Sequence, residues 1–187
     1  MKSKKSLVVS NAGPLIHLAK INLLHVLKDL YQEVIIPFEV KVEAVDLGMA
    51  KGFADAIQIN DAVDEGWIKV EEIELTQEFI KMAQIAGLKT AEAAVIYHAY
   101  KNHGTALLDE DSARALARTL GIPIRGTLGI ILESLKRGFL SRTEAFKALE
   151  KLSDIMYLSA DLYIIVRDEI ERSYVRHKTK KLHPFRT

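Results

Sequence analysis

The sequence predicts an α/β sandwich, because short apolar runs alternate with longer segments whose apolar residues recur at helical spacing. The run SLVVS at 6–10 is followed by the helical pattern PLIHLAKINLLHVLKDL at 14–30. In the same way, EVII at 33–36 is followed by FEVKVEAVDLG at 38–48. Each pair is a strand followed by a helix, and two such pairs in succession are typical of a sheet covered by helices.

Prolines and turn residues mark where these first elements meet. Pro14 and Pro37 stand at the starts of the two helical patterns. The fixed φ angle of proline suits the first turn of a helix, where its missing N–H group costs nothing. Asn11 or Gly13 can provide the non-helical turn between the first strand and its helix. We therefore expect these helices to begin at Pro14 and at Pro37.

The alternation continues along the chain, with weaker patterns in its middle. Thr90 is the predicted N-cap of the helix AEAAVIYHAYK at 91–101, and the strand TALL at 105–108 ends in an acidic turn at 109–111. The other expected elements are helices over 53–63, 76–86, 112–120, 126–138 and 161–172, and strands over 67–73 and 123–125.

Two caps mark the helices near the C-terminus. Ser141 and Glu144 have the S-x-x-E spacing of a capping box, and Ser159 is placed to cap the last helix. We expect a single domain over residues 1–187, in which 126–187 is a helical extension that ends in a basic tail.

Composition restricts the class of protein. With 187 residues, 49% of them hydrophobic, and only 10 Gly and 4 Pro, the chain has the material for a buried core. The absence of Cys excludes disulfides, thiolate metal sites and cysteine nucleophiles, and it fits the reducing cytoplasm. No apolar run approaches the roughly 20 residues of a membrane-spanning helix. We expect a cytoplasmic protein with no membrane partner.

Polar side chains directly after two predicted strands are the candidates for chemistry. Asn11 follows the first strand, and Asp109, Glu110 and Asp111 follow TALL. Ligands of open α/β sheets bind outside the carboxyl ends of the strands. Three consecutive carboxylates repel one another unless a cation or donor groups neutralise them, and Mg²⁺ prefers such oxygen ligands. The alternative is that Asp109 or Asp111 caps the following helix.

Two further carboxylates have ordinary explanations as well. Glu92 lies in the first turn of its predicted helix, where a negative charge stabilises the helix dipole. Glu43 follows Glu39 by four residues, a spacing typical of a solvent-facing stripe. Periodicity alone selects neither residue as a ligand.

Five ordered segments carry a resemblance to the PIN-domain nuclease family, in particular to a prokaryotic branch with toxin-like members. The resemblance spans nearly the whole chain and implies a three-layer α/β/α sandwich with a mainly parallel sheet and extra C-terminal helices. The segments are SNAGPLIHLAKINLL, IPFEVKVEAV, LKTAEAAVIYHAY, ALLDEDSARALARTLGI and GTLGIILESLKRGFL.

The resemblance also implies a metal-dependent hydrolysis of RNA, with 3′-hydroxyl and 5′-phosphate products. In the family, acids gathered at the strand ends hold Mg²⁺ or Mn²⁺. Carried over by motif, the metal ligands are Asn11, Glu43, Glu92, Asp109 and Asp111, of which the four acids are also the catalytic residues. Glu110 is a weaker candidate for a metal ligand than its neighbours Asp109 and Asp111.

Asn11 departs from the family, which usually has Asp at this position. An amide oxygen can bind a hard cation, but it contributes no negative charge. The resemblance therefore implies an endoribonuclease, including the toxin of a toxin–antitoxin pair, and leaves open a weakened module that binds RNA or protein. A third interpretation is an interaction domain that dimerises through LYIIV at 162–166.

Basic and small residues near these motifs are candidates for binding substrate phosphates. Ser10 flanks the first position, and Lys20 and Arg114 could lie near the groove, as could Arg118 and Arg125. The alternative for each cation is an ordinary surface charge. The expected partners are RNA, an antitoxin protein and a second copy of the chain.

Overall fold

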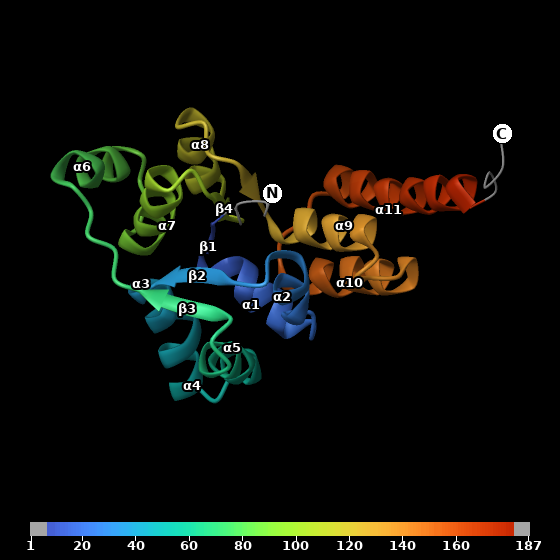
Figure 1. Ribbon diagram of the computed structural model, residues 1–187, viewed down its shortest axis with the longest axis horizontal. Helices are drawn as coiled ribbons and strands as arrows, with labels where there is room; N and C mark the ends of the chain where they lie inside the picture. The colour runs from blue at the N-terminus through green and yellow to red at the C-terminus, as the bar shows by residue number, and fades with distance from the viewer. Residues whose placement is uncertain (1–6, 182–187) are drawn as a thin grey trace, which may run out of the picture. The chain divides into compact units, whose positions relative to one another are not determined.

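The computed structural model describes residues 7–181, and their side chains up to 173. The chain divides into two compact units, Met1–Thr127 and Leu128–Thr187, and each is described by itself. The expected basic tail lies mostly outside the described side chains. The first unit holds a parallel sheet between helices, which confirms the predicted three-layer α/β/α class (Figure 1).

The sheet has five strands in the order β3-β2-β1-β4-β5, and every neighbouring pair is parallel. Both β1 and β2 are buried along their whole length, as expected of parallel strands covered on both faces. The order places β1 and β4 side by side at the centre, although about a hundred residues of chain separate them. The strands are β1 (Val8–Ser10), β2 (Val34–Pro37), β3 (Ile68–Glu71), β4 (Thr105–Leu107) and β5 (Ile124–Arg125).

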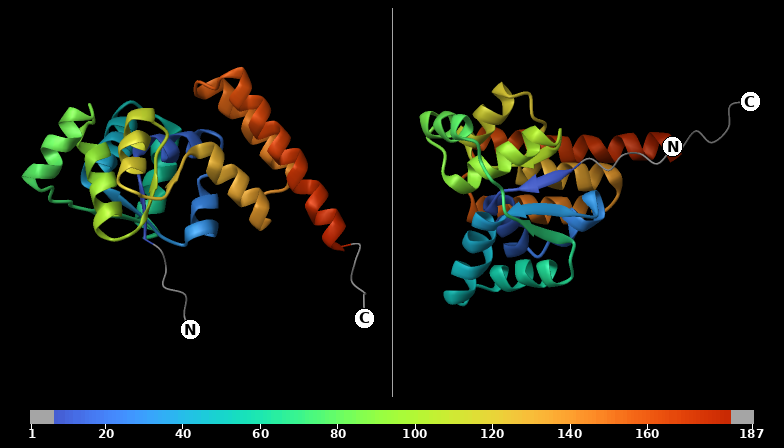
Figure 2. Two further views of the ribbon diagram at one scale, coloured as in Figure 1. Left: turned by 90° about the horizontal axis from the view of Figure 1, so that it is seen from above. Right: turned by 60° about the vertical axis from the view of Figure 1, so that its left-hand side comes forward.

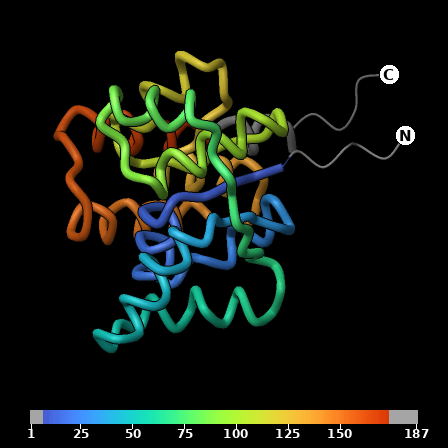
Figure 3. Tube along the Cα trace, turned by 90° about the vertical axis from the view of Figure 1, so that its left-hand side faces the viewer, coloured from blue at the N-terminus to red at the C-terminus, as the bar shows by residue number. Residues whose placement is uncertain are grey.

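Helices cover the two faces of this sheet (Figures 1 and 3). Helix α7 packs on β1, β2 and β4, while α1 and α5 pack together across the sheet from it. The helical elements of the first unit are α1 (Ala12–Lys20), α2 (His25–Tyr31), α3 (Phe38–Lys41), the π-helical segment η1 (Val42–Asp46), α4 (Leu47–Ala50), α5 (Ala54–Asp64), α6 (Gln77–Ile85), α7 (Thr90–Lys101) and α8 (Asp111–Thr119).

The expected helix over 14–30 is wrong in two respects. It begins at Ala12, so Pro14 occupies the third position, which still lies in the first turn where N–H groups have no intrahelical partner. It also breaks after Lys20, where Asn22 adopts a left-handed φ of 60°, and a second helix begins only at His25. Leu23 N–H then bonds back to the Leu18 carbonyl. Apolar residues recur through this break, so their spacing does not reveal it.

Smaller differences concern element ends and helix type. The helix after β2 begins at Phe38 rather than Pro37, continues to Ala50, and contains the π-helical turn η1. The N-cap of α7 is Lys89, one residue before the predicted Thr90. The strand expected over 67–73 is shorter, because only Ile68–Glu71 pair with β2.

The second unit consists of helices, of which α10 packs against α11 (Figure 2). The predicted capping box is confirmed: Ser141 Oγ accepts from the Glu144 backbone N–H at 3.2 Å, and the Ser141 N–H donates to the Glu144 carboxylate at 2.7 Å. The helices are α9 (Thr127–Arg137), which starts at the last residue of the first unit, α10 (Arg142–Ile155) and α11 (Ala160–Lys181), which is longer than the expected 161–172. No helix within the described residues is long and apolar enough to cross a membrane.

Candidate functional site

Strand pairing brings the ends of β1 and β4 together. Ser10 lies opposite Leu107 in the parallel register, and the Asn11 backbone N–H donates to the Leu107 carbonyl at 3.0 Å. The chain proceeds outward from β1 through β2 to β3 and then crosses to β4 and β5, so β1 and β4 form the switch point of the sheet. Ligand sites of open α/β sheets form in the crevice at such a point.

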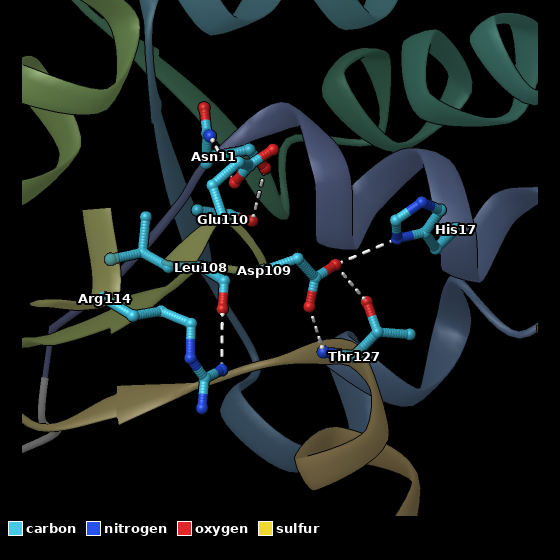
Figure 4. A network of polar contacts seen from close by, with 8 residues as sticks. Asn11, His17, Leu108, Asp109, Glu110, Arg114 and Thr127 are labelled. Atoms are coloured by element: carbon cyan, nitrogen blue, oxygen red, sulfur yellow. Dashed lines mark hydrogen bonds and ion pairs between the residues drawn. The ribbon is translucent and has the colours of Figure 1, made fainter. Parts of the chain in front are cut away.

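Asn11 and Glu110 contact each other at this edge of the sheet (Figure 4). Asn11 Nδ2 donates to Glu110 Oε2 at 3.2 Å. Asn11 is only 3% exposed, and its Oδ1 atom is buried without a hydrogen-bond partner among the described residues. A buried acceptor left unpaired costs about 1–3 kcal/mol. An oxygen atom of Asn11 that has no hydrogen-bond partner therefore lies near the Glu110 carboxylate.

These two residues are helix N-caps whose side chains do not cap. Asn11 is the N-cap of α1 and Glu110 is the N-cap of α8, yet neither side chain bonds to the first turn of its own helix. Asn and Asp at an N-cap normally accept from a backbone N–H of that turn. Neither side chain makes this local bond, and the two contact each other instead.

Asp109 points away from this pair and is held by three donors (Figure 4). Its Oδ2 atom bonds to His17 Nδ1 at 2.9 Å and accepts from the Thr127 hydroxyl at 2.6 Å. Its Oδ1 atom accepts from the Thr127 backbone N–H at 2.7 Å. Since Thr127 is the first residue of α9, Asp109 caps that helix from a distance. The idea that Asp109 caps α8 is therefore wrong, because the N-cap of α8 is Glu110.

The surroundings of Asp109 favour its ionised form. Burial raises the pKa of this carboxyl, but the hydrogen bonds from His17 and Thr127 and the charge of His17 outweigh burial, so the pKa is lowered from its usual 3.8. A carboxyl whose pKa is lower in the folded than in the unfolded protein stabilises the fold above its unfolded pKa. It loses that contribution as the pH falls through the folded value.

We expect Asp109→Asn to lower the free energy of unfolding of the metal-free protein by about 2 kcal/mol at pH 7, because hydrogen bonds to a buried charge are lost. The difference from the natural protein should shrink below pH 4, as Asp109 itself becomes protonated. Urea denaturation in EDTA between pH 7 and pH 3 measures it. A difference that stays constant down to pH 3 would contradict the assignment.

Two glycines allow the carboxylates to pack so closely. A Cβ atom on Gly126 would lie 2.7 Å from Arg114 Nη1 and 2.9 Å from Asp109 Oδ1. A Cβ atom on Gly13 would lie 3.3 Å from Glu110 Oε1. Arg114 Nη1 donates to the Leu108 carbonyl at 3.1 Å, which holds this half-buried guanidinium beside Asp109. The acids and the cation thus share one compact cluster.

The other predicted ligands lie outside this contact network. Glu92 is 8% exposed, and its carboxylate accepts from the Lys89 N–H at 2.8 Å, the helix-terminal role considered as its alternative. Because α7 precedes β4 and runs antiparallel to it, its first turn lies at the same edge of the sheet as Asn11. Glu43 is exposed within η1, and Asp111 is exposed at the first residue of α8.

The residues considered for phosphate binding differ in their surroundings. Ser10 is fully buried, and its hydroxyl donates to the Asn11 carbonyl at 2.9 Å, which makes it a support of the turn. Lys20 ends α1, a nine-residue helix that starts at the crevice, so it lies about 12 Å further along the helix axis. Arg118 and Arg125 are exposed.

Asn11 and Glu110 provide a small number of oxygen groups for a hard cation such as Mg²⁺. In the described part of the chain, no three His, Asp or Glu side chains lie close enough together to hold a metal ion. Mg²⁺, however, is commonly bound through one or two carboxylates, with water and substrate phosphate completing its coordination. The unpaired Asn11 Oδ1 and the Glu110 carboxylate are two neighbouring oxygen groups of the kind that such an ion binds.

Glu110, the weaker candidate among the three acids, is the one that contacts Asn11, and two further residues of the cluster were not predicted. His17 lies within the expected helix over 14–30, and its contact with Asp109 spans 92 positions, which no local pattern reveals. Thr127 did carry a usable signal, because this polar residue lies two positions after the end of β5, at the carboxyl edge of the sheet.

Three comparisons with known proteins place the chain in context. The family model described as DUF3368, PIN domain, matches residues 7–172. Among solved structures, the crystal structure of PAE2754 from Pyrobaculum aerophilum is similar, with 16% sequence identity and a TM-score of 0.44. The match covers 62% of this chain and 97% of that one. None of the curated proteins matches the chain.

Proposed function

The chain belongs to the PIN domain family, and from that membership we propose that it is a metal-dependent endoribonuclease whose ion is held at Asn11 and Glu110. The family is one of nucleases, which act on nucleic acids and typically use divalent metals. The observation that carries the proposal is the buried, unpaired Oδ1 of Asn11 beside the Glu110 carboxylate. This pair lies at the switch point of the sheet, where a ligand is expected.

Asn11 Oδ1 and the Glu110 carboxylate would hold Mg²⁺ or Mn²⁺. When bound, such an ion lowers the pKa of a coordinated water and offsets negative charge on the phosphate. Arg114, held beside Asp109 by its bond to Leu108, adds a positive charge close to the same acids. Ligand or catalytic roles for Glu43, Glu92 and Asp111 stay predictions.

The proposed reaction is hydrolysis of a phosphodiester bond in RNA. One water molecule is consumed: its oxygen bonds to phosphorus, and the bond between phosphorus and the 3′ oxygen breaks. The leaving 3′ oxygen takes up one proton of the water, so the products are a 3′-hydroxyl and a 5′-phosphate. Toxin activity, an antitoxin partner and a homodimer are further predictions from the resemblance.

A second candidate function is an RNA- or protein-binding module without hydrolysis. Two observations favour it: Asn11 brings no charge to the ion, and Asp109 is fully occupied by protein donors. A single carboxylate with one amide oxygen binds a divalent ion more weakly than two carboxylates do. The two candidates share the same crevice and differ in whether the bound RNA is cut.

Cleavage of an end-labelled, mixed-sequence RNA tests the proposal. We expect Mn²⁺-dependent fragments that carry 5′-phosphates, no cleavage in EDTA, and no cleavage by Asn11→Leu purified in the same way. Equal cleavage by the natural protein and Asn11→Leu would identify a contaminant and contradict the proposal. RNA binding in EDTA with no cleavage in Mn²⁺ would favour the second candidate.

A further inference from the structure

We infer that Asp109, His17 and Thr127 are positioning residues that hold the Glu110 carboxylate against Asn11, and that Asp109 does not bind the ion. The inference rests on the proposed function, since it concerns the same site. It reverses the expectation from the resemblance, in which Asp109 is a direct ligand and Glu110 a weaker candidate. It also adds His17 and Thr127, two residues that were not among the predicted site residues.

The carboxylate of Asp109 has little left to offer a cation. Its two oxygens receive three short hydrogen bonds from His17 and Thr127, and the side chain is 12% exposed. An ion would have to displace these donors and leave the Thr127 N–H, at the start of α9, unpaired. Stranding a buried donor costs about 1–3 kcal/mol for each group.

The Glu110 carboxylate differs from the Asp109 carboxylate both in its hydrogen bonds and in its exposure. Asn11 Nδ2 is its bonded partner at 3.2 Å, and Glu110 is more exposed than Asp109. Figure 4 shows the two adjacent acids turned to different sides, Asp109 toward Thr127 and Glu110 toward Asn11. Fixing the first of two consecutive residues therefore restricts the direction in which the second can point.

One helix holds both acids. Helix α1 carries Asn11 at its N-cap and His17 within its second turn, so it contacts Glu110 and Asp109 with two side chains of the same rigid element. Thr127 holds Asp109 from the other side, at the end of β5. The turn after β4 is thus held by α1 on one side and by Thr127 on the other, all within the first unit.

Calorimetric titration of the whole chain with Mn²⁺ tests this assignment with matched variants. Thr127→Val keeps the shape of the side chain but removes the hydroxyl, whereas Thr127→Ser keeps it. We expect Thr127→Val to raise the Kd for Mn²⁺ about 10-fold, the usual cost of losing a group that orients a ligand, and Thr127→Ser to stay within about 2-fold. His17→Leu and His17→Asn should differ in the same way, because Asn retains a donor.

Comparison of Asp109→Asn with Glu110→Gln separates the two roles of Asp109. If Asp109 were the ligand, Asp109→Asn would weaken Mn²⁺ binding at least as much as Glu110→Gln, whereas a positioning role predicts the larger loss for Glu110→Gln. Mn²⁺ binding by Thr127→Val as tight as that of the natural protein, or the larger loss in Asp109→Asn, would overturn the inference. With RNA, Thr127→Val should lower kcat about 10-fold while KM changes less than 2-fold, since the ion and not RNA binding is affected.

Amide hydrogen exchange of the metal-free protein tests the positioning role independently of metal binding and RNA cleavage. The Arg114 N–H donates to the Glu110 carbonyl at 3.0 Å, so its exchange rate reports the order of Glu110. We expect exchange at Arg114 to be about 10-fold faster in Thr127→Val than in Thr127→Ser. Unchanged exchange would overturn the positioning role. If the natural protein binds no Mn²⁺, the proposed function fails, while a faster exchange still supports the clamp.

Discussion

Glu110→Gln is expected to lower Mn²⁺-dependent RNA cleavage at least about 100-fold, which corresponds to about 2.7 kcal/mol of transition-state stabilisation. Glu110 supplies the negative charge next to the unpaired Oδ1 of Asn11. Glutamine has the same size but no charge, so the variant tests the carboxylate and not its volume. Single-turnover cleavage of a labelled RNA, with Mn²⁺ varied at each protein concentration, measures the loss.

Two further variants show whether the loss of activity is specific to the Glu110 carboxylate. Glu74→Gln makes the same change on an exposed residue between β3 and α6, and should leave cleavage within about 2-fold. Asp109→Asn should lose about 10-fold, since it disturbs the orientation of Glu110 without removing its charge. If Asp109→Asn lost far more activity than Glu110→Gln, the roles assigned to the two acids would have to be exchanged.

Asn11→Asp is expected to have the opposite effect on metal binding. The donor that Asn11 presents to Glu110 at 3.2 Å becomes a second negative charge. Without metal, the two carboxylates repel and the free energy of unfolding should fall by about 1–3 kcal/mol. A divalent ion removes this repulsion, so the Kd for Mn²⁺ should fall about 10-fold or more, and Mn²⁺ should raise Tm further than in the natural protein.

The control for this variant is Asn102→Asp, which makes the same charge change at the exposed C-cap of α7. That residue precedes β4 and so lies at the opposite edge of the sheet. The affinity of the Asn102→Asp variant for Mn²⁺ should match that of the natural protein. If Asn11→Asp also left the affinity unchanged, Asn11 would not line an ion site, although the observed contact with Glu110 would stand.

Much of the fold follows from the sequence because its signals are local. Apolar runs such as EVII are long enough for a buried strand, and the capping box at Ser141 fixes the start of α10. The break at Asn22 was not predicted, because the apolar spacing on both sides is compatible with one continuous helix. Tertiary contacts, and not propensity, decide such a break.

The candidate site could be predicted only as far as local position allows. That polar residues after β1 and β4 meet follows from the rule for parallel sheets, and Asn11 and Glu110 do meet. Which of three consecutive acids faces Asn11 depends on what its neighbours contact. Asp109 contacts Thr127, which the pairing of Leu107 with Arg125 brings close to it. Such a register is not encoded in any one segment.

Anomalous diffraction from crystals of the natural protein soaked in Mn²⁺ tests the central assignment most directly. We expect one manganese peak in contact with the Asn11 Oδ1 atom and the Glu110 carboxylate, with the bonds from His17 and Thr127 to Asp109 intact. A peak on the Asp109 carboxylate, with those bonds broken, would contradict it.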